Sequence, residues 1–405
     1  MKRFGLLGEK LGHSFSVPIH SKLADYEYKL YEKSPSELED FLKNPQLDGM
    51  NVTIPYKKAV IPYCAKLSDA AKKIGSVNTL VLKEEGWHGH NTDYYGFIYM
   101  LKYAGITPEG KKVLVLGDGG ASLTVQCALE DLGAKEIVVM SRHTDNTYDK
   151  LDRYYDADII INTTPVGMYP NCPASLINLD SFKNCCGVAD VIYNPSKTKL
   201  LSDAERLAIP HVNGLPMLVA QAKYASEIFT GKKIHDEKID EIVKEIETQT
   251  KNIVLIGMPG SGKSLIGKLL AETLDRKFAD CDEMIVSREG NIEEIFKNHG
   301  ESYFRKVETE VIKDISKESG YIISTGGGCV TVEENFNLLH QNSYVVWLKR
   351  DISLLSTEGR PLSKKSNLEE MYKVRKPLYE KFSDYKVENV SSPEEAVRKI
   401  KECLL

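Results

Sequence analysis

Residues 252–274 read NIVLIGMPGSGKSLIGKLLAETL, and this stretch decides the fold of the C-terminal part of the chain. Its first residues are a short apolar run, which predicts a buried strand. Residues 257–264, GMPGSGKS, fit the pattern GxxxxGK[ST], in which glycines turn backbone N–H groups toward phosphate oxygens. A helix over 265–274 follows at once and adds its positive N-terminal end. We therefore expect Lys263 to reach the β and γ phosphates of a nucleotide and Ser264 to ligate Mg²⁺.

A second stretch of the same kind lies nearer the N-terminus. The apolar residues 112–116 (KVLVL) run into the glycine turn GDGGAS at 117–122, and a helix follows to residue 132. A tight turn that brings the backbone and a helix N-terminus together suits the pyrophosphate of a dinucleotide. The next predicted strand, 136–140, ends at Ser141 and Arg142. An arginine at this place suits the 2′-phosphate of NADP, whereas NAD sites carry an acidic residue there.

Apolar strand-like runs occur at several further places, namely 3–7, 28–31, 49–53, 78–82, 158–162, 188–193, 321–324 and 344–348. Continuous apolar strands between helices are typical of parallel sheets. We predict an α/β protein with a Rossmann-like dinucleotide domain and a C-terminal P-loop domain. The family resemblances given below imply that an N-terminal α/β substrate lobe accompanies the first and that the second is a kinase of the nucleoside monophosphate kinase type. The expected domains are 1–103 with 214–247, then 104–213, a linker at 248–251, and 252–405.

Composition excludes several classes of protein. The 53 basic and 58 acidic side chains give a net charge of -5, which offers no general reason to bind nucleic acid or an acidic membrane. No run approaches the roughly 18 apolar residues of a membrane span. The eight cysteines form no CxxC pair. We expect a cytoplasmic protein with reduced thiols whose partners are small molecules.

Two segments of the N-terminal part contain groups suited to proton transfer. NVTIPYK ends at Lys57, and NTD ends at Asp93. A ketone reduced by hydride needs a proton donor, and a lysine beside a carboxylate can supply the proton. Taken singly, Lys57 is a surface lysine, and Asp93 is an N-cap for a helix over 94–103.

Seven motifs together resemble shikimate dehydrogenase, in the order of that family, over residues 1 to about 245. They are SxS (14–16), NVTIPYK (51–57), SVNT (76–79), NTD (91–93), GDGGAS (117–122), NTTPVGM (162–168) and GLPMLVAQA (214–222). The resemblance implies that Lys57 and Asp93 are the catalytic pair. The shikimate-binding residues that it implies are Ser14, Ser16, Thr53, Lys57, Asn78, Asp93, Tyr193 and Gln221. Those for NADP are Gly117, Asp118, Gly119, Gly120, Ala121, Ser141, Arg142, Thr163 and Gly214.

Three departures from that family pattern stand out. Val17 displaces the proline after Ser16 to position 18. Asp118 replaces a small residue of the glycine turn. Asp145 and Asn146 stand where a second arginine is usual. The last two departures leave dual use of NADP and NAD open.

Five motifs follow the phosphate loop: FADCD (278–282), GESYFR (300–305), TGGG (325–328), RPL (360–362) and RKPLY (375–379). Asp280 and Asp282 would lie on one side of an extended segment, so one could serve Mg²⁺ and the other a substrate hydroxyl. The arginines suit bidentate recognition of a carboxylate.

This order resembles shikimate kinase over residues 252–405. The resemblance implies ATP binding by Gly260, Ser261, Gly262, Lys263, Ser264 and Arg360. It implies shikimate binding by Asp282, Arg305, Gly326, Gly327, Gly328 and Arg375. Ser264 and Asp280 would serve the metal, and Asp282, Lys263 and Arg360 would be catalytic. No arginine lies between Asp351 and Arg360, so the adenine-side arginine of that family has no clear counterpart.

The two resemblances together imply a bifunctional enzyme. Its first half would reduce 3-dehydroshikimate to shikimate with NADPH, and its second half would phosphorylate shikimate with ATP and Mg²⁺. One alternative is that the first half prefers quinate, although the paired Ser14 and Ser16 favour shikimate. The other is a ligand-sensing regulator without catalysis, which the complete set of catalytic side chains disfavours. Direct transfer of shikimate between the two sites is a further hypothesis, motivated by the fusion and the short linker.

Overall fold

The structure is a computed structural model that describes residues 2–12, 14–355 and 365–404. The chain divides into two compact units. Unit 1 comprises Met1–Val166, Ser175–Tyr193 and Asp203–Glu245, and unit 2 comprises Gly167–Ala174, Asn194–Ser202 and Ile246–Leu405. Within the described residues, no helix is both long and apolar enough to cross a membrane. All eight cysteines lie in this part of the chain, and no disulfide joins any of them.

The first sheet of unit 1 is mixed, with the strand order β2-β1-β3-β5-β6-β4. Its strands are β1 (Arg3–Gly8), β2 (Glu27–Glu32), β3 (Gly49–Val52), β4 (Cys64–Leu67), β5 (Thr79–Lys83) and β6 (Gly86–His90). Strand β5 runs antiparallel to both β3 and β6. The four strands expected here are confirmed to within one residue at each end. Strands β4 and β6 were missed because CAKL and GWHGH show no continuous apolar run. Three short helices accompany this sheet, α1 (Ser16–Leu23), α2 (Leu38–Lys43) and α3 (Asp69–Ile74).

The second sheet of unit 1 is parallel throughout, in the order β11-β10-β9-β7-β8. Its strands are β7 (Lys112–Leu116), β8 (Glu136–Met140), β9 (Ile159–Asn162), β10 (Gly187–Asp190) and β11 (His211–Val212). Alternate residues such as Val113 and Val115 share a core with α4 (Asp93–Tyr103) and α5 (Gly120–Asp131). The strand expected at 188–193 ends earlier, because the Asp190 carboxylate accepts the backbone N–H of Ile192 and turns the chain.

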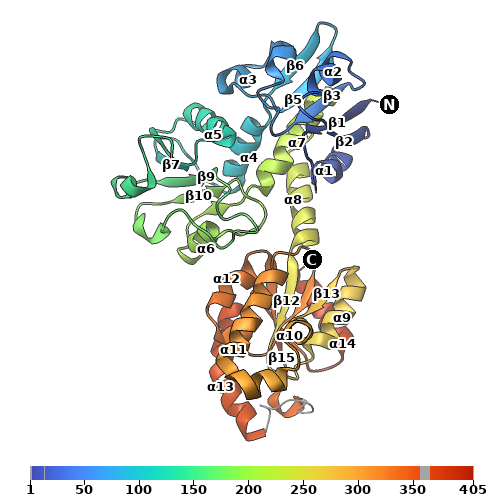
Figure 1. The fold of residues 1–405 in the computed structure, drawn as a ribbon, viewed down its shortest axis with the longest axis vertical. Helices are drawn as coiled ribbons and strands as arrows, with labels where there is room; N and C mark the ends of the chain where they lie inside the picture. Colours follow the sequence, from blue (N-terminus) through green and yellow to red (C-terminus); the bar gives the residue numbers. More distant parts are fainter. Residues whose placement is uncertain (1, 13, 356–364, 405) are drawn as a thin grey trace. The chain divides into compact units, whose positions relative to one another are not determined.

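Helices α4 and α7 (Leu215–Thr230) lie between the two sheets of unit 1 (Figure 1). Phe229 near the end of α7 packs in the core of the first sheet, whereas Met217 near its start packs in the core of the second. The two helices approach closely at Gly96, where a Cβ would lie 2.7 Å from the carbonyl oxygen of Met217. The remaining helices that begin in the first 250 residues are α6 (Lys199–Arg206) and α8 (Glu237–Thr250).

Unit 2 contains a parallel sheet in the order β13-β14-β12-β15-β16. Its strands are β12 (Asn252–Ile256), β13 (Phe278–Asp280), β14 (Ile322–Ser324), β15 (Ser343–Lys349) and β16 (Tyr385–Glu388). Its helices are α9 (Lys263–Leu274), α10 (Cys281–Glu289), α11 (Ile292–Ile315), α12 (Glu334–His340), α13 (Lys365–Phe382) and α14 (Pro393–Leu404). Short 3₁₀ helices complete the chain, namely η1 (Ile61–Tyr63), η2 (Tyr148–Tyr154), η3 (Leu179–Ser181), η4 (Cys329–Thr331) and η5 (Ile352–Leu354).

Helices cover both faces of this sheet. Ile253 and Leu255 of β12 pack with α9 and α14, whereas Val254 and Ile256 pack with α11, α12 and α13. Side chains alternate between the two faces of a strand, so a strand covered on both faces is apolar throughout. The continuous run that predicted β12 is explained in this way, and the expected α/β class is confirmed.

Two candidate active sites

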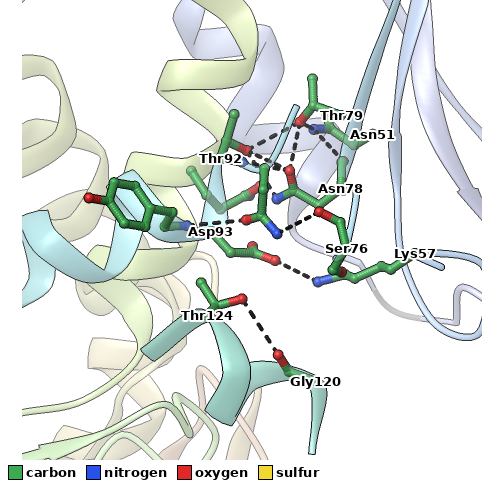
Figure 2. A network of polar contacts seen from close by, with 12 residues as sticks. Asn51, Lys57, Ser76, Asn78, Thr79, Thr92, Asp93, Gly120 and Thr124 are labelled. Atoms are coloured by element: carbon green, nitrogen blue, oxygen red, sulfur yellow. Dashed lines mark hydrogen bonds and ion pairs between the residues drawn. The ribbon is translucent and has the colours of Figure 1, made fainter. Parts of the chain in front are cut away.

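Lys57 and Asp93 form an ion pair in unit 1 (Figure 2). Lys57 lies in the turn after β3, Asp93 is the first residue of α4, and Nζ is 2.6 Å from Oδ2. The two side chains are 33% and 18% exposed. The helix-capping alternative for Asp93 is wrong, because the N-cap position belongs to Thr92. A half-buried ammonium group held by a carboxylate is well placed to donate a proton to a bound substrate.

Buried amide side chains hold the segment that carries Asp93. The backbone N–H of Thr92 donates to Asn78 Oδ1 at 2.7 Å, and Asn78 Nδ2 donates to Thr92 Oγ1 at 3.0 Å. Asn91 Nδ2 donates to the carbonyl oxygen of Ser76 at 3.0 Å. Thr92 and Asn91 were not among the expected site residues, although both stand in the motifs that identified their neighbours. The network ties the start of α4 to the first sheet and so positions Asp93.

The other expected shikimate contacts come from separate elements of unit 1. Ser14 Oγ accepts the backbone N–H of Ser16 at 3.2 Å. Tyr193, in the loop after β10, lies edge-on to the Phe15 ring with 6.1 Å between ring centroids. Thr53 directly follows β3, and Gln221 lies on α7 where that helix meets Gly96. Tyr193 therefore lies beside the segment that carries Ser14 and Ser16. The contacts of all these residues with a substrate stay predictions.

The glycine turn after β7 has the features of an anion site. Gly117 has a φ of 104°, and a Cβ there would lie 2.9 Å from Thr163 Oγ1, which itself donates to the carbonyl oxygen of Leu116 at 2.7 Å. Within the described residues, no side-chain hydrogen bond caps the start of α5. Among the described residues, no atom beyond the adjacent backbone lies within 4 Å of the Cβ position of Gly119 or Gly120. Free N–H groups beside open space fit the pyrophosphate of a dinucleotide.

The Asp118 carboxylate of this turn contacts the residues at the end of β8. Asp118 Oδ2 accepts a hydrogen bond from Ser141 Oγ at 2.9 Å and lies 3.1 Å from His143 Nδ1. The hydrogen bond from Ser141, assisted by His143, lowers the pKa of Asp118. Arg142, which stands between Ser141 and His143 in the sequence, is exposed. At Gly214 the start of α7 approaches the loop after β10 closely, because a Cβ on this glycine would clash with a backbone oxygen of that loop.

The phosphate loop in unit 2 has the expected geometry. Lys263 Nζ is buried and donates to the carbonyl oxygens of Gly257 at 2.9 Å and Met258 at 3.1 Å. Gly260 and Gly262 have φ values of 82° and 92°, which favour glycine. In this described segment, no side-chain hydrogen bond caps α9. The N–H groups of the loop and of the first turn of α9 fit the phosphates of ATP.

A hydroxyl and a carboxylate lie beside the loop. Ser264 Oγ donates to Asp280 Oδ2 at 2.6 Å, and Asp280 Oδ1 accepts the backbone N–H of Asp282 at 3.0 Å. Mg²⁺ prefers oxygen ligands of this kind and commonly uses one or two protein groups together with phosphate oxygens. The pair fits the expected metal.

A cavity of about 700 Å³ joins the loop to most of the other kinase candidates. The expected residues that line it are Gly260, Gly262, Lys263, Ser264, Asp282, Arg305, Gly326, Gly327, Gly328 and Arg375. Ser261 and Asp280 are buried beside the cavity and are not part of its lining. Arg360 lies outside the described residues, so its expected role is not addressed by the structure.

A buried carboxylate orients one of the two expected carboxylate-binding arginines. Glu308 Oε2 lies 2.6 Å from Arg305 Nη1, and Glu301 Oε1 lies 3.1 Å from Nη2. Burial tends to lower the pKa of Arg305, but the charge of Glu308 and its hydrogen bond raise it. Glu308 was not among the expected residues, although its position three residues beyond Arg305 places both on one helical face.

The glycine turn after β14 packs closely against the side chains of Glu308 and Arg305. A Cβ on Gly326 would clash with Glu308, and one on Gly328 would clash with the Arg305 guanidinium. The carbonyl oxygen of Gly327 accepts hydrogen bonds from Arg375 Nη1 at 3.1 Å and from the hydroxyl of a buried tyrosine, Tyr379, at 2.5 Å. The structure therefore brings together the two arginines and the triple-glycine turn.

Comparison with known proteins assigns both parts of the chain. The family described as shikimate dehydrogenase substrate binding domain matches residues 6–80, and the family described as shikimate kinase matches residues 259–405. A curated shikimate dehydrogenase (NADP(+)) from Clostridium perfringens is 38% identical over 268 residues, which cover 61% of this chain and 99% of that protein. The chain belongs to the shikimate dehydrogenase family. It also carries a shikimate kinase domain, which makes it a bifunctional enzyme of the shikimate pathway.

Solved structures resemble the dehydrogenase part. One is a chorismate mutase/shikimate 5-dehydrogenase fusion protein from Clostridium acetobutylicum, with 37% identity, a TM-score of 0.58, and coverage of 61% of this chain and 97% of that chain. Another is the shikimate 5-dehydrogenase of Listeria monocytogenes in complex with shikimate and NAD, with 31% identity, a TM-score of 0.55, and coverage of 60% and 96%. The expected fold and enzyme classes are confirmed, and the expected NADP(H), ATP and Mg²⁺ agree with these families.

Proposed function

We propose that the dehydrogenase part reduces 3-dehydroshikimate to shikimate with NADPH, and that the kinase domain then phosphorylates the 3-hydroxyl of shikimate with ATP. The observation that carries the first activity is the 2.6 Å contact between Lys57 and Asp93 in a chain of this family. The second activity is supported by the cavity that the phosphate loop shares with Arg305 and Arg375.

We also propose the division into a substrate lobe (1–103 with 214–247), a dinucleotide domain (104–213), a linker (248–251) and a kinase domain (252–405). It is supported by the three sheets, because the strands of each sheet fall within one of these parts. Unit 2 additionally contains residues 167–174 and 194–202, which belong to the proposed dinucleotide domain.

In the reduction, NADPH supplies the hydride that reaches the carbonyl carbon. The Lys57 ammonium donates a proton to the carbonyl oxygen as negative charge develops on it. Asp93 orients the ammonium group through the 2.6 Å contact, and the bonds between Asn78 and Thr92 keep Asp93 in place. Lys57 is one-third exposed, so solvent can return the proton afterwards.

In the phosphorylation, Arg305 and Arg375 bind the substrate carboxylate, and Asp282 accepts a hydrogen bond from the reacting hydroxyl. Lys263 and the N–H groups at the start of α9 hold the phosphates of ATP. Ser264 and Asp280 would hold Mg²⁺, which neutralises phosphate charge when bound. The hydroxyl oxygen bonds to the γ-phosphorus, its proton passes to Asp282, and the bond to the β–γ bridging oxygen breaks.

The test is to incubate the protein with 3-dehydroshikimate, NADPH, ATP and Mg²⁺ and to measure NADPH oxidation and shikimate 3-phosphate. We expect Lys57→Ala to slow NADPH oxidation by about 10²- to 10⁴-fold. Lys263→Ala should leave this oxidation intact and let shikimate accumulate. Lys58→Ala and Lys268→Ala are matched controls on exposed neighbouring lysines. Full NADPH oxidation by the Lys57→Ala variant would contradict the assignment, as would faster oxidation of quinate than of shikimate in the reverse direction.

A further inference from the structure

Arg350 is a cation in the kinase cavity that the proposed mechanism does not use. It directly follows β15, the strand that pairs with β12 and so reaches the same end of the sheet as the phosphate loop. It lines the same cavity as Lys263 and Ser264. Its Nη1 lies 3.9 Å from the Cβ position of Gly262.

The guanidinium of Arg350 has no protein partner among the described residues. Its Nε is buried and has no hydrogen-bond acceptor, and no described carboxylate forms an ion pair with it. By contrast, Lys263 donates to two carbonyl oxygens, and Arg375 donates to a carbonyl oxygen. The Nε of Arg305 is also without an acceptor, but its Nη atoms pair with Glu308 and Glu301. A buried polar group without a partner is costly, so a charged one beside a phosphate loop points to a ligand.

The phosphate loop has two distinct ends, and Arg350 lies at one of them. Pro259 packs against the triple-glycine turn of the shikimate site, because a Cβ on Gly327 would lie 2.6 Å from Pro259 Cδ. Gly262 instead faces Arg350 and Asn389, and Asn389 Nδ2 donates to the carbonyl oxygen of Ser261 at 2.8 Å. The γ-phosphate must point at the shikimate hydroxyl, so the nucleoside lies toward the opposite end of the loop.

We propose that Arg350 binds the nucleoside end of ATP, with its planar guanidinium against the adenine ring. A guanidinium stacks well on flat aromatic systems and is more weakly hydrated than an ammonium group. The segment from Asp351 to Arg360 offers no arginine of its own between these two residues, and Arg350 supplies one immediately before it. This proposal rests on the kinase activity proposed above.

The test compares ADP with inorganic tripolyphosphate, each with Mg²⁺, by calorimetric titration of the full chain. Arg350→Ala should weaken ADP binding about tenfold and leave tripolyphosphate binding unchanged. Arg350→Lys keeps the charge without the planar group and should weaken ADP binding to a similar degree. In the kinase assay both variants should raise the KM for ATP and leave the KM for shikimate unchanged. Lys349→Ala, on the neighbouring residue that pairs with Glu388, should change none of these values.

Equal losses of ADP and tripolyphosphate affinity would overturn the proposal, because Arg350 would then bind phosphate. Full rescue by lysine, or unchanged ADP affinity in both variants, would also overturn it. A wild-type chain that binds neither ADP nor tripolyphosphate would instead contradict the proposed kinase function. The two failures are therefore distinguishable.

Discussion

Asp118 and Arg142 carry opposite charges close to the end of β8, where Rossmann-like domains recognise the adenosine ribose. Arg142 suits the 2′-phosphate of NADP, whereas the Asp118 carboxylate repels that phosphate and can accept hydrogen bonds from the ribose hydroxyls of NAD. Asp118 comes from the glycine turn and reaches Ser141 only through the tertiary structure. We therefore predict that these two side chains, with opposing effects, influence how strongly NADPH is preferred over NADH.

We predict that Asp118→Asn raises the preference for NADPH. The substitution keeps a hydrogen-bond acceptor for Ser141 and removes the negative charge, so the ratio of kcat/KM for NADPH to that for NADH should increase about tenfold. Asp118→Glu keeps the charge and should leave the ratio near the wild-type value. Fluorescence titrations with both cofactors provide an independent measurement of binding. An unchanged ratio in Asp118→Asn would show that this carboxylate does not affect cofactor choice.

Among the secondary-structure elements, α7 connects the cores of both sheets in unit 1 and also carries buried charges. Lys223 and Glu227 are one helical turn apart, with Nζ and Oε1 at 3.0 Å, and their side chains are 5% and 8% exposed. Lys223 also pairs with Asp236, just before α8, and Glu227 accepts the backbone N–H of Ile234 at 2.8 Å. These contacts fix the segment between α7 and α8.

We predict that Glu227→Gln destabilises unit 1 by about 2 kcal/mol at pH 7, because Lys223 keeps only one of its two acidic partners. Burial tends to raise the pKa of Glu227, but the hydrogen bonds from Ile234 and Lys223 lower it overall. A carboxylate with a lowered pKa in the folded state stabilises the fold above its unfolded pKa of about 4.5, and this stability is lost as pH falls through the folded value.

Urea denaturation at several pH values measures this effect. The difference in unfolding free energy between wild type and Glu227→Gln should be full at pH 7 and should shrink as the pH falls below about 4. Glu241→Gln, on an exposed face of α8, is the control and should change the unfolding free energy by less than about 0.5 kcal/mol. Equal effects of the two substitutions at pH 7 would contradict the role assigned to Glu227.

At the scale of the whole molecule, the described groups of each catalytic site come from one unit. Lys57, Asp93 and the glycine turn after β7 belong to unit 1, whereas Lys263, Arg305 and Arg375 belong to unit 2. A chain that has lost one site therefore retains the other, and the intermediate can pass between chains through solution.

We predict that a mixture of the Lys57→Ala and Lys263→Ala variants converts 3-dehydroshikimate to shikimate 3-phosphate, although neither variant does so alone. The time course should show a lag while shikimate accumulates in solution. Direct transfer within one chain would give the wild type a shorter lag than the mixture at equal active-site concentrations. If the mixture forms no product, both sites must be intact in the same chain.

Local signals in the sequence were sufficient to predict the strands β7 and β12 and the glycine turns that follow them. The strands β7 and β12 are covered on both faces, which requires continuous apolar runs, and the turns after them need glycine for backbone reasons alone. The family motifs added Lys57, Asp93, Arg305 and others, many of which the structure brings together. Strands β4 and β6 left no such signal, since they depend on pairing with partners elsewhere in the first sheet.

By itself, the sequence determined the α/β class and the positions of the two glycine turns, because these depend on short-range periodicity and fixed spacing, and its family motifs predicted both catalytic sets. Only the tertiary structure decided which side chains support those sets. Glu308 behind Arg305 and Arg350 beside the phosphate loop are ordinary charged residues in sequence. Asp118 stands out in the glycine turn, but only the tertiary structure brings it against the end of β8. Their significance comes from burial and from partners, or the lack of them, at the ends of neighbouring strands, and packing alone creates that environment.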